Sequence, residues 1–183
     1  DLADERGPCP DAADYGYNEG FANKTAIAPT ASISIICGGA SPWVEPVAAN
    51  SYTHKTLSGS FNVRNRYLVE LLEKHGKNTD DVWSGITTNQ GSVSHLDFLT
   101  DLEKDVFKTA FELDQKWIIE LSGDRTPYIS QAQSINLFVP ADIHKRELHK
   151  IHFDAWKKGL KSLYYCRSKS IQRAENVNDT KAT

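Results

Sequence analysis

The C-terminal part of the chain alternates strand-like and helix-like patterns, and this alternation restricts the possible folds more than any other feature. Residues 134–139 alternate enough to form a strand that ends at Pro140. Residues 143–161 have apolar side chains at helical spacing, and residues 162–166 form a second strand candidate. A strand, a helix and a strand in succession predict a βαβ unit with parallel strands and a right-handed crossover. Together with a β-prone run at residues 25–28, the unit predicts the α/β class.

Further helices are expected upstream of this unit. Apolar residues recur at helical spacing in residues 63–74, and residues 80–88 form a short helix with acidic side chains in its first turn. Residues 99–121 have the clearest apolar stripe, and Gly123 is the expected end of that helix. Stretches rich in Gly, Pro, Asn, Asp or Ser predict loops at residues 1–24 and 38–60.

The amino-acid composition argues against several classes of function for this chain. The chain has 183 residues, about one domain, and its 21 basic and 24 acidic residues give a net charge of −3, which disfavours nucleic-acid binding through charge. No apolar run approaches the roughly 20 residues of a membrane-spanning helix. Three cysteines without a CxxC motif argue against a disulfide framework or structural zinc, and predict a reducing compartment such as the cytoplasm. The chain contains no Met, even at position 1, so we expect a piece of a longer chain.

A strand end followed by hydroxyl residues and a helix start predicts a candidate anion site. The β-prone run stops at Pro29, and Thr30 or Ser32 is a credible N-cap for a short helix over residues 33–37. The N–H groups and the positive end of a helix bind phosphate readily. From spacing alone, an ordinary Ser/Thr cap without a ligand is the favoured interpretation, because neither GxxxxGKS nor GxGxxG occurs.

Tyr164 and Tyr165 form a second candidate site. Side chains of neighbouring residues in a strand point to opposite faces, so the two phenols are not expected to stack by default. Aromatic residues are common in strands, which favours a packing role. The functional alternative is redox chemistry, because a phenol can lose a proton and an electron together.

Other polar residues favour structural roles. His149 and His152 share a helix face, but the HExxH spacing is absent, so a packed or solvated face is favoured over a metal pair. Cys37 lies in an apolar helical turn and is interpreted as structural. Glu45 and the amides within residues 131–136 suggest a hydrogen-bonded network, for which packing is the favoured role.

In combination, these segments resemble the C-terminal part of the large, catalytic subunit of class I ribonucleotide reductases. The similarity covers nearly the whole chain in the family's order, and its two ends are the most specific. The matching stretches are AIAPTASIS at 26–34, VEP at 44–46, LSGSF at 57–61, GSV at 91–93, QAQSIN at 131–136 and WKKGLKSLYYCRS at 156–168.

The resemblance implies a fold and two sites. The fold would be a partial α/β barrel, the last portion of the family's ten-stranded barrel, with residues 1–166 in the barrel domain and residues 167–183 as a polar, mobile tail. A loop that binds the diphosphate of the substrate would consist of Pro29, Thr30, Ala31, Ser32 and Ile33. The catalytic relay would be Tyr164, facing the active-site cysteine, and Tyr165, facing the subunit interface.

The resemblance also implies partners. These are a ribonucleoside diphosphate, a small radical-bearing subunit, the upstream half of the large subunit and a second copy of the full subunit, with no nucleic acid and no membrane. No metal ligand and no cofactor is assigned to this segment, because the radical or metal cofactor is expected in the small subunit. The family's Asn-x-Cys-x-Glu motif and its reducing cysteine pair do not occur here, so we expect the segment to be inactive alone.

Two other functions stay open. A cobalamin-dependent reductase shares the barrel and the phosphate loop but does not need a tyrosine pair, so Tyr164 and Tyr165 argue against that alternative. A non-catalytic nucleotide-phosphate binding module would bind nucleoside diphosphates without any redox activity. Binding that weakens when Ser32 loses its hydroxyl, without turnover, would identify such a module.

Overall fold

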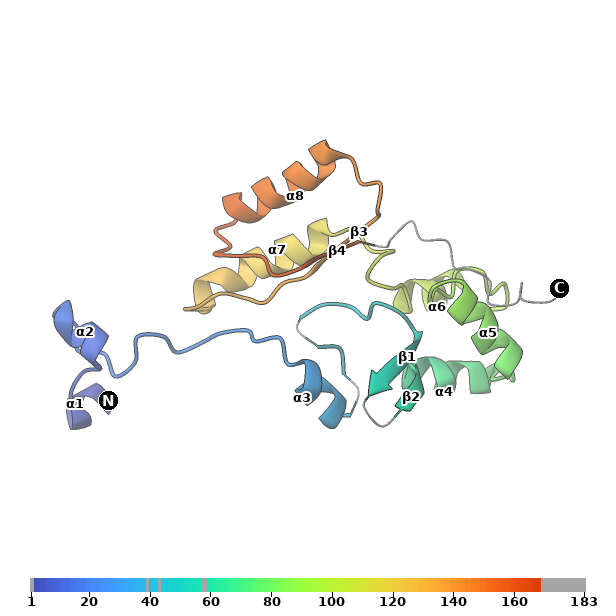
Figure 1. Ribbon diagram of the computed structural model, residues 1–183, viewed down its shortest axis with the longest axis horizontal. Coiled ribbons are helices and arrows are strands. Elements are labelled where there is room, and N and C mark those ends of the chain that lie inside the picture. The colour runs from blue at the N-terminus through green and yellow to red at the C-terminus, as the bar shows by residue number, and fades with distance from the viewer. Residues whose placement is uncertain (1, 39, 43, 57–58, 169–183) are drawn as a thin grey trace, which may run out of the picture.

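The computed structural model describes residues 2–38, 40–42, 44–56 and 59–168 of the chain (Figure 1). Its helices are α1 (Leu2–Arg6), α2 (Pro10–Asp14), α3 (Ala31–Ile36), α4 (Arg66–Lys74), α5 (Asp80–Thr88), α6 (Asp101–Val106), α7 (Lys116–Arg125), the 3-10 helix η1 (Thr126–Tyr128) and α8 (Lys145–Lys157). Its strands are β1 (Ser51–Thr56), β2 (Gly59–Arg64), β3 (Leu137–Val139) and β4 (Cys166–Ser168). The tail expected from residue 167 thus begins inside β4, and residues 169–183 lie outside the described ranges.

A parallel arrangement of strands organises the C-terminal part of the fold. Strands β3 and β4 pair in parallel and α8 connects them, which confirms the order and the parallel pairing of the expected βαβ unit. The bounds differ, because β3 covers only the end of the strand expected at residues 134–139, and β4 shares only Cys166 with the strand expected at residues 162–166. Residues 131–139, here called the central segment, also receive Ile27 in a parallel bridge to Gln133. The strand expected at residues 25–28 is reduced to this bridge. The central segment therefore has Ile27 on one edge and the chain leading into β4 on the other.

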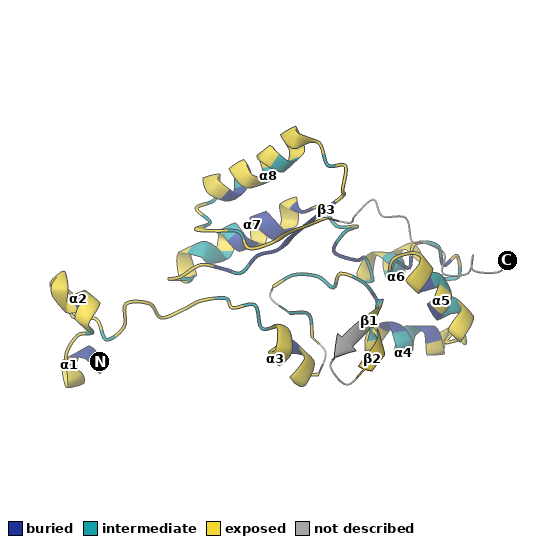
Figure 2. Ribbon diagram, in the orientation of Figure 1, coloured by how far each residue is buried: buried dark blue, intermediate teal, exposed yellow. Residues whose placement is uncertain are grey.

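Helices α7 and α8 pack together beside the central segment, where Figure 2 shows buried residues on α7. Ile119, Leu137 and Ala155 form the buried core between them. Gly123 does not end α7, as expected, but lies within it. A Cβ at this position would come within 2.9 Å of the Lys158 side chain, so the absence of a side chain allows the segment after α8 to approach α7.

The expectation of a single helix over residues 99–121 is wrong. Helices α6 and α7 occupy parts of this range, and an irregular segment at residues 107–115 separates them. The buried amide of Gln115 gives a physical reason. It donates to the Ala110 carbonyl at 2.9 Å and accepts the Phe138 N–H at 2.8 Å, so a tertiary contact replaces helical hydrogen bonding there.

A second core lies between α4, α5 and the segment that follows them. Its buried residues are Leu68, Leu72, Trp83, Ile86, Val93, Leu96 and Leu99. Helix α5 covers the expected residues 80–88. Helix α4 begins at Arg66 rather than at residue 63, because the Asn65 side chain accepts the Tyr67 N–H and caps the helix there.

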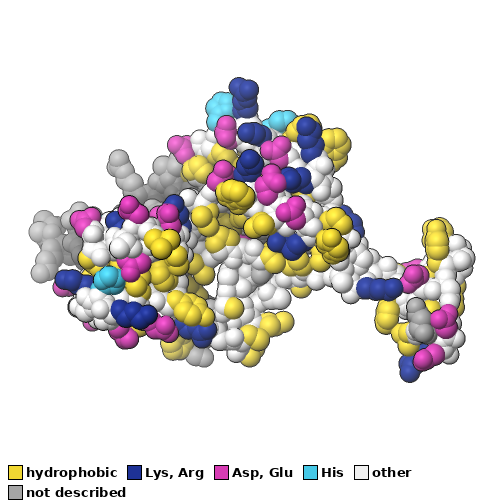
Figure 3. Space-filling model, turned by 180° about the vertical axis from the view of Figure 1, so that it is seen from behind, with side chains coloured by type: hydrophobic (Ala, Val, Ile, Leu, Met, Phe, Trp, Pro, Cys, Tyr) yellow, Lys and Arg dark blue, Asp and Glu magenta, His cyan; other side chains and the backbone are white. Residues whose placement is uncertain are grey.

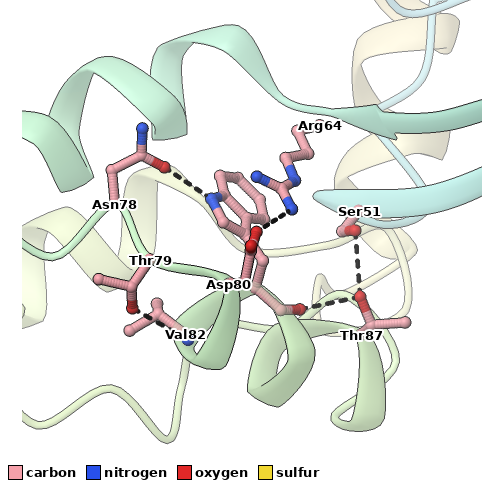
Figure 4. A network of polar contacts seen from close by, with 8 residues as sticks. Ser51, Arg64, Asn78, Thr79, Asp80, Val82 and Thr87 are labelled. Carbon is pink, nitrogen blue, oxygen red and sulfur yellow. Dashed lines mark hydrogen bonds and ion pairs between the residues drawn. The ribbon is translucent and has the colours of Figure 1, made fainter.

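A hairpin of β1 and β2 occupies part of the region expected as a loop at residues 38–60. Contacts with α5 hold it in place (Figure 4). The hydroxyls of Ser51 and Thr87 lie 3.1 Å apart, and the Arg64 guanidinium donates to the Asp80 carboxylate at 3.0 Å. Because an isolated hairpin is only marginally stable, these tertiary contacts explain why local sequence alone did not predict it.

The N-terminal region contains α1 and α2, although residues 1–24 are expected as a loop. Figure 1 shows these helices at one end of the molecule, joined to the rest by an extended segment. Among the described residues, no helix has both the length and the apolar character that crossing a bilayer requires.

Candidate functional site

The loop at residues 29–33 follows the Ile27 bridge and opens helix α3. The first helical hydrogen bond runs from the Ser34 N–H to the Thr30 carbonyl at 2.8 Å, so the N–H groups of residues 31–33 precede the helical bonds. Pro29 and Thr30 are half-buried, whereas Ala31, Ser32 and Ile33 are exposed. The expected strand-to-helix transition is confirmed in position, with the helix beginning two residues early.

Thr30 has an unusual backbone conformation. It occupies the N-cap of α3 with φ 51° and ψ 25°, in the left-handed region, and its side chain caps none of the α3 N–H groups. A β-branched residue rarely adopts this conformation, which costs about 1–3 kcal/mol. Strain of this kind is concentrated at ligand-binding sites, and here it lies where the expected phosphate contacts begin.

Tyr164 and Tyr165 are in direct contact. Their ring centroids lie 4.2 Å apart with an interplanar angle of 56°. A hydrogen bond between the two phenols, together with the charge that Tyr165 acquires on ionisation, raises the pKa of Tyr164. Both side chains are about half exposed, so the pair lies at the surface of the described residues. The expectation that the two rings point to opposite faces is wrong.

The main chain explains the contact. Strand β4 begins at Cys166, so the tyrosines precede the regular ladder. The Tyr164 N–H donates to the Ile135 carbonyl at 2.8 Å, and the Tyr165 N–H donates to Asn136 Oδ1 at 3.1 Å. In a regular strand, successive N–H groups point to opposite edges. Here both point to the central segment, and this local bend places both rings on one side.

Asn136 connects this bend to Glu45. The Asn136 side chain is fully buried, and its Nδ2 donates to Glu45 Oε1 at 3.2 Å. Burial raises the pKa of the Glu45 carboxyl, while the hydrogen bond from Asn136 and the charge of Arg167 partly oppose that rise. The Arg167 guanidinium also lies 5.6 Å from the centre of the Tyr165 ring. The sequence indicates a polar network here, but not its contact with the tyrosine pair.

Strand register places the two candidate sites beside the two edges of the central segment. Ile27 is opposite Gln133, and the Tyr164 N–H bonds the Ile135 carbonyl two residues further along the same segment. The 29–33 loop therefore follows a contact on one edge of this segment, and the tyrosine pair lies at the other edge.

The remaining candidates do not join this site. The His149 ring stacks on Phe153 with centroids 6.0 Å apart, and His152 Nδ1 bonds the Leu148 carbonyl at 2.8 Å. In the part of the chain that the structure describes, no group of three His, Cys, Asp or Glu residues could hold a metal ion. Cys37 lies at the end of the apolar helix α3, as expected, but its side chain is exposed, which does not support the packed structural role interpreted for it.

Comparison with known proteins identifies the family. The model of the ribonucleotide reductase barrel domain matches residues 11–166. The ribonucleoside-diphosphate reductase large subunit of Invertebrate iridescent virus 6 is 51% identical over 97% of this chain, and the match covers 19% of that relative. The subunit alpha of Chlamydia trachomatis serovar D is 39% identical over 82% of this chain and 14% of its own length.

A solved structure gives the same result. The Actinobacillus ureae class Id ribonucleotide reductase alpha subunit superimposes with a TM-score of 0.78 and 39% sequence identity, covering 92% of this chain and 30% of that one. The chain thus spans less than a third of these relatives, and the expected α/β fold forming part of a barrel is confirmed. The chain belongs to the ribonucleotide reductase barrel-domain family and corresponds to a segment of the large subunit.

Proposed function

We propose that this chain is part of a ribonucleoside-diphosphate reductase large subunit, and that it takes part in reducing ribonucleotides to deoxyribonucleotides. The contact between Tyr164 and Tyr165, beside the same central segment that Ile27 bridges ahead of the 29–33 loop, is the observation that carries the proposal. The family's reacting cysteines match none of Cys9, Cys37 and Cys166. We therefore expect the segment to act only within a complete subunit.

The 29–33 loop is the proposed binding site for the substrate diphosphate. Pro29 and Thr30 begin the loop, and Ala31, Ser32 and Ile33 contribute main-chain N–H groups at the start of α3. The hydroxyls of Thr30 and Ser32 add donors for phosphate oxygens. Exposure of residues 31–33 and the strained Thr30 backbone support a ligand at this position.

The tyrosine pair is the proposed radical relay. The oxidising equivalent would come from a radical or metal cofactor in the small subunit, and we assign no cofactor to this segment. Tyr165 would be oxidised to a phenoxyl radical by the small subunit. Tyr164, once it carries the radical, would take a hydrogen atom from a cysteine elsewhere in the large subunit and leave the radical on that cysteine. Phenols that share a hydrogen bond allow a proton and an electron to move together, which supports this role.

Exposed apolar side chains support the proposal that this segment binds further protein partners. Ile33, Ile35 and Ile36 of α3 are all more than half exposed, and so are Trp117 and Trp156. Figure 3 shows apolar side chains at several places on the face seen from behind, among charged ones. Exposed large apolar side chains, and aromatic ones above all, are enriched at protein interfaces. We propose that the rest of the large subunit and a second copy of it cover such surfaces, in the cytoplasm.

The test uses the complete large subunit that contains this segment, mixed with its small subunit and a ribonucleoside diphosphate. Tyr164→Phe should abolish deoxyribonucleotide formation while leaving nucleotide binding intact, because phenylalanine keeps the ring and removes the O–H bond. Ser32→Ala should weaken nucleotide binding. Unchanged turnover in Tyr164→Phe would refute the relay, and binding without any turnover in the unmodified mixture would favour a binding module.

A further inference from the structure

We propose that Asn136 and Glu45 are positioning residues that hold Tyr164 and Tyr165 in ring contact. This inference rests on the radical relay proposed above and assigns a role to two side chains outside the tyrosine pair. Neither side chain passes the electron. Their role is to fix the bend in the main chain that places two neighbouring phenols on the same side.

Asn136 supplies the hydrogen bond that the main chain of the central segment does not provide. The Tyr165 carbonyl accepts the Leu137 N–H at 2.8 Å, so a continued ladder would direct the Tyr165 N–H at the Ile135 carbonyl, but the Tyr164 N–H occupies that acceptor. Asn136 Oδ1 instead accepts this N–H at 3.1 Å, while the preceding Tyr164 N–H bonds the Ile135 carbonyl at 2.8 Å. Since Asn136 is fully buried, water cannot replace its amide without reorganisation of the core.

Glu45 fixes the orientation of that amide. An asparagine side chain can turn over and exchange its oxygen for its nitrogen, which would place a donor against the Tyr165 N–H. The Glu45 carboxylate accepts only, and Oε1 takes the Asn136 Nδ2 donor at 3.2 Å. The amide oxygen therefore remains directed at Tyr165. The chain of contacts runs from Glu45 through Asn136 to the tyrosine pair.

The contact matters for one step of the relay. The Tyr165 phenoxyl radical takes a hydrogen atom, one proton and one electron, from the Tyr164 phenol. The O–H bond of Tyr164 breaks, an O–H bond forms on Tyr165, and the radical is then on Tyr164. Short-range transfer of this kind is sensitive to geometry, and a displacement of about 1 Å costs up to about a hundredfold in rate.

The experiment measures radical arrival at each tyrosine separately. Aminotyrosine, which is more easily oxidised than tyrosine and traps the radical, replaces Tyr164 in one preparation of the complete subunit and Tyr165 in another. Each preparation is mixed with the small subunit and substrate, and the trapped radical is measured by electron paramagnetic resonance. Asn136→Ala and Glu45→Ala should lower the yield at position 164 at least about tenfold and leave the yield at 165 within about twofold.

Two further variants separate positioning from general stability. Glu45→Gln keeps the size of the side chain but presents a donor as well as an acceptor, so the Asn136 amide can turn over and the yield at position 164 should fall. Gln133→Ala removes another buried amide of the central segment, one that donates to the Ser122 carbonyl at 2.9 Å rather than to the tyrosines. This variant should leave the ratio of the two yields unchanged.

Two results would overturn the inference while leaving the relay intact. One is an unchanged yield at position 164 in both alanine variants. The other is an equal loss at positions 164 and 165, which would indicate a general structural role. If the unmodified complex traps no radical at either position, the relay and the positioning role both fail.

Discussion

Gly91 lies so close to Ala49 that a Cβ at position 91 would come within 2.4 Å of the Ala49 Cβ. The Gly91 backbone has a φ of +82°, in the left-handed region that favours glycine. Its carbonyl accepts two hydrogen bonds from the fully buried Asn50, from the main-chain N–H at 3.1 Å and from Nδ2 at 2.9 Å. This contact fastens the start of β1 to the segment that follows α5.

Replacing Gly91 with alanine should therefore destabilise the protein by roughly 3 kcal/mol, because overpacking and backbone strain add together. Denaturant unfolding of the complete subunit measures the change. Gly76→Ala is the matched control, since Gly76 also has a positive φ, of 63°, while a Cβ there would meet no described atom within 4 Å. It should cost about 1 kcal/mol. Equal losses in the two variants would contradict the role of the Ala49 contact.

A second prediction concerns Gly123 within α7. Alanine favours a helix over glycine by about 1 kcal/mol, which on its own would stabilise the protein. The new Cβ would, however, meet Lys158 Cβ and Cδ at 2.9 Å each. Overpacking costs about 1–3 kcal/mol, so a net loss of stability is expected. Thermal unfolding measures it, and a rise in melting temperature would show that the Lys158 side chain moves aside at little cost.

Acid sensitivity should depend on Glu103. Hydrogen bonds from His75 and from Thr100 lower the pKa of Glu103 from its ordinary value of 4.5 to about 2. A carboxyl whose pKa is lower in the folded state stabilises the fold above its unfolded pKa and loses that effect as the pH falls. Wild type should thus exceed Glu103→Gln in stability above pH 4.5, and the two should converge near pH 2. A difference in unfolding free energy between the two proteins that stays constant across this pH range would contradict the prediction.

The sequence predicted the elements whose signals are local. The order of the βαβ unit and the bounds of α5 follow from periodicity and caps, and the structure confirms them. Buried polar side chains caused the errors, because their partners are distant in the sequence. Gln115 breaks the helix expected over residues 99–121 by bonding Phe138. The β1–β2 hairpin likewise depends on contacts with α5 that no local pattern encodes.

The candidate site shows the same division. The sequence indicated the residues of the 29–33 loop and the tyrosine pair as candidates. It did not indicate how the two tyrosine rings lie relative to each other. Strand alternation predicted that the two rings separate, but the rings are in contact at a bend where the Tyr165 N–H donates to Asn136 Oδ1. A polar asparagine beside an apolar run is unusual for a strand and was the one available signal. The boundary at residue 166 between the barrel domain and the polar tail stays a prediction.

The last prediction separates stability from ligand binding at Thr30. Glycine adopts the left-handed backbone of this position, φ 51°, without the strain that a β-branched residue has there. Relief of about 1–3 kcal/mol of strain competes with the greater backbone entropy that glycine gives the unfolded chain, about 1 kcal/mol. Thr30→Gly should therefore fold at least as stably as the wild type.

The same substitution should weaken nucleotide binding, because it removes the proposed hydroxyl donor to a phosphate oxygen. Loss of one hydrogen bond to a charged group costs about 1.5–3 kcal/mol, roughly a tenfold or greater loss of affinity. Calorimetric titration of a ribonucleoside diphosphate into the complete subunit measures this, with Thr53→Gly on β1 as a hydroxyl control away from the loop. Unchanged affinity in Thr30→Gly would remove its hydroxyl from the phosphate site, whereas lower stability would show that the wild-type backbone stores no strain there.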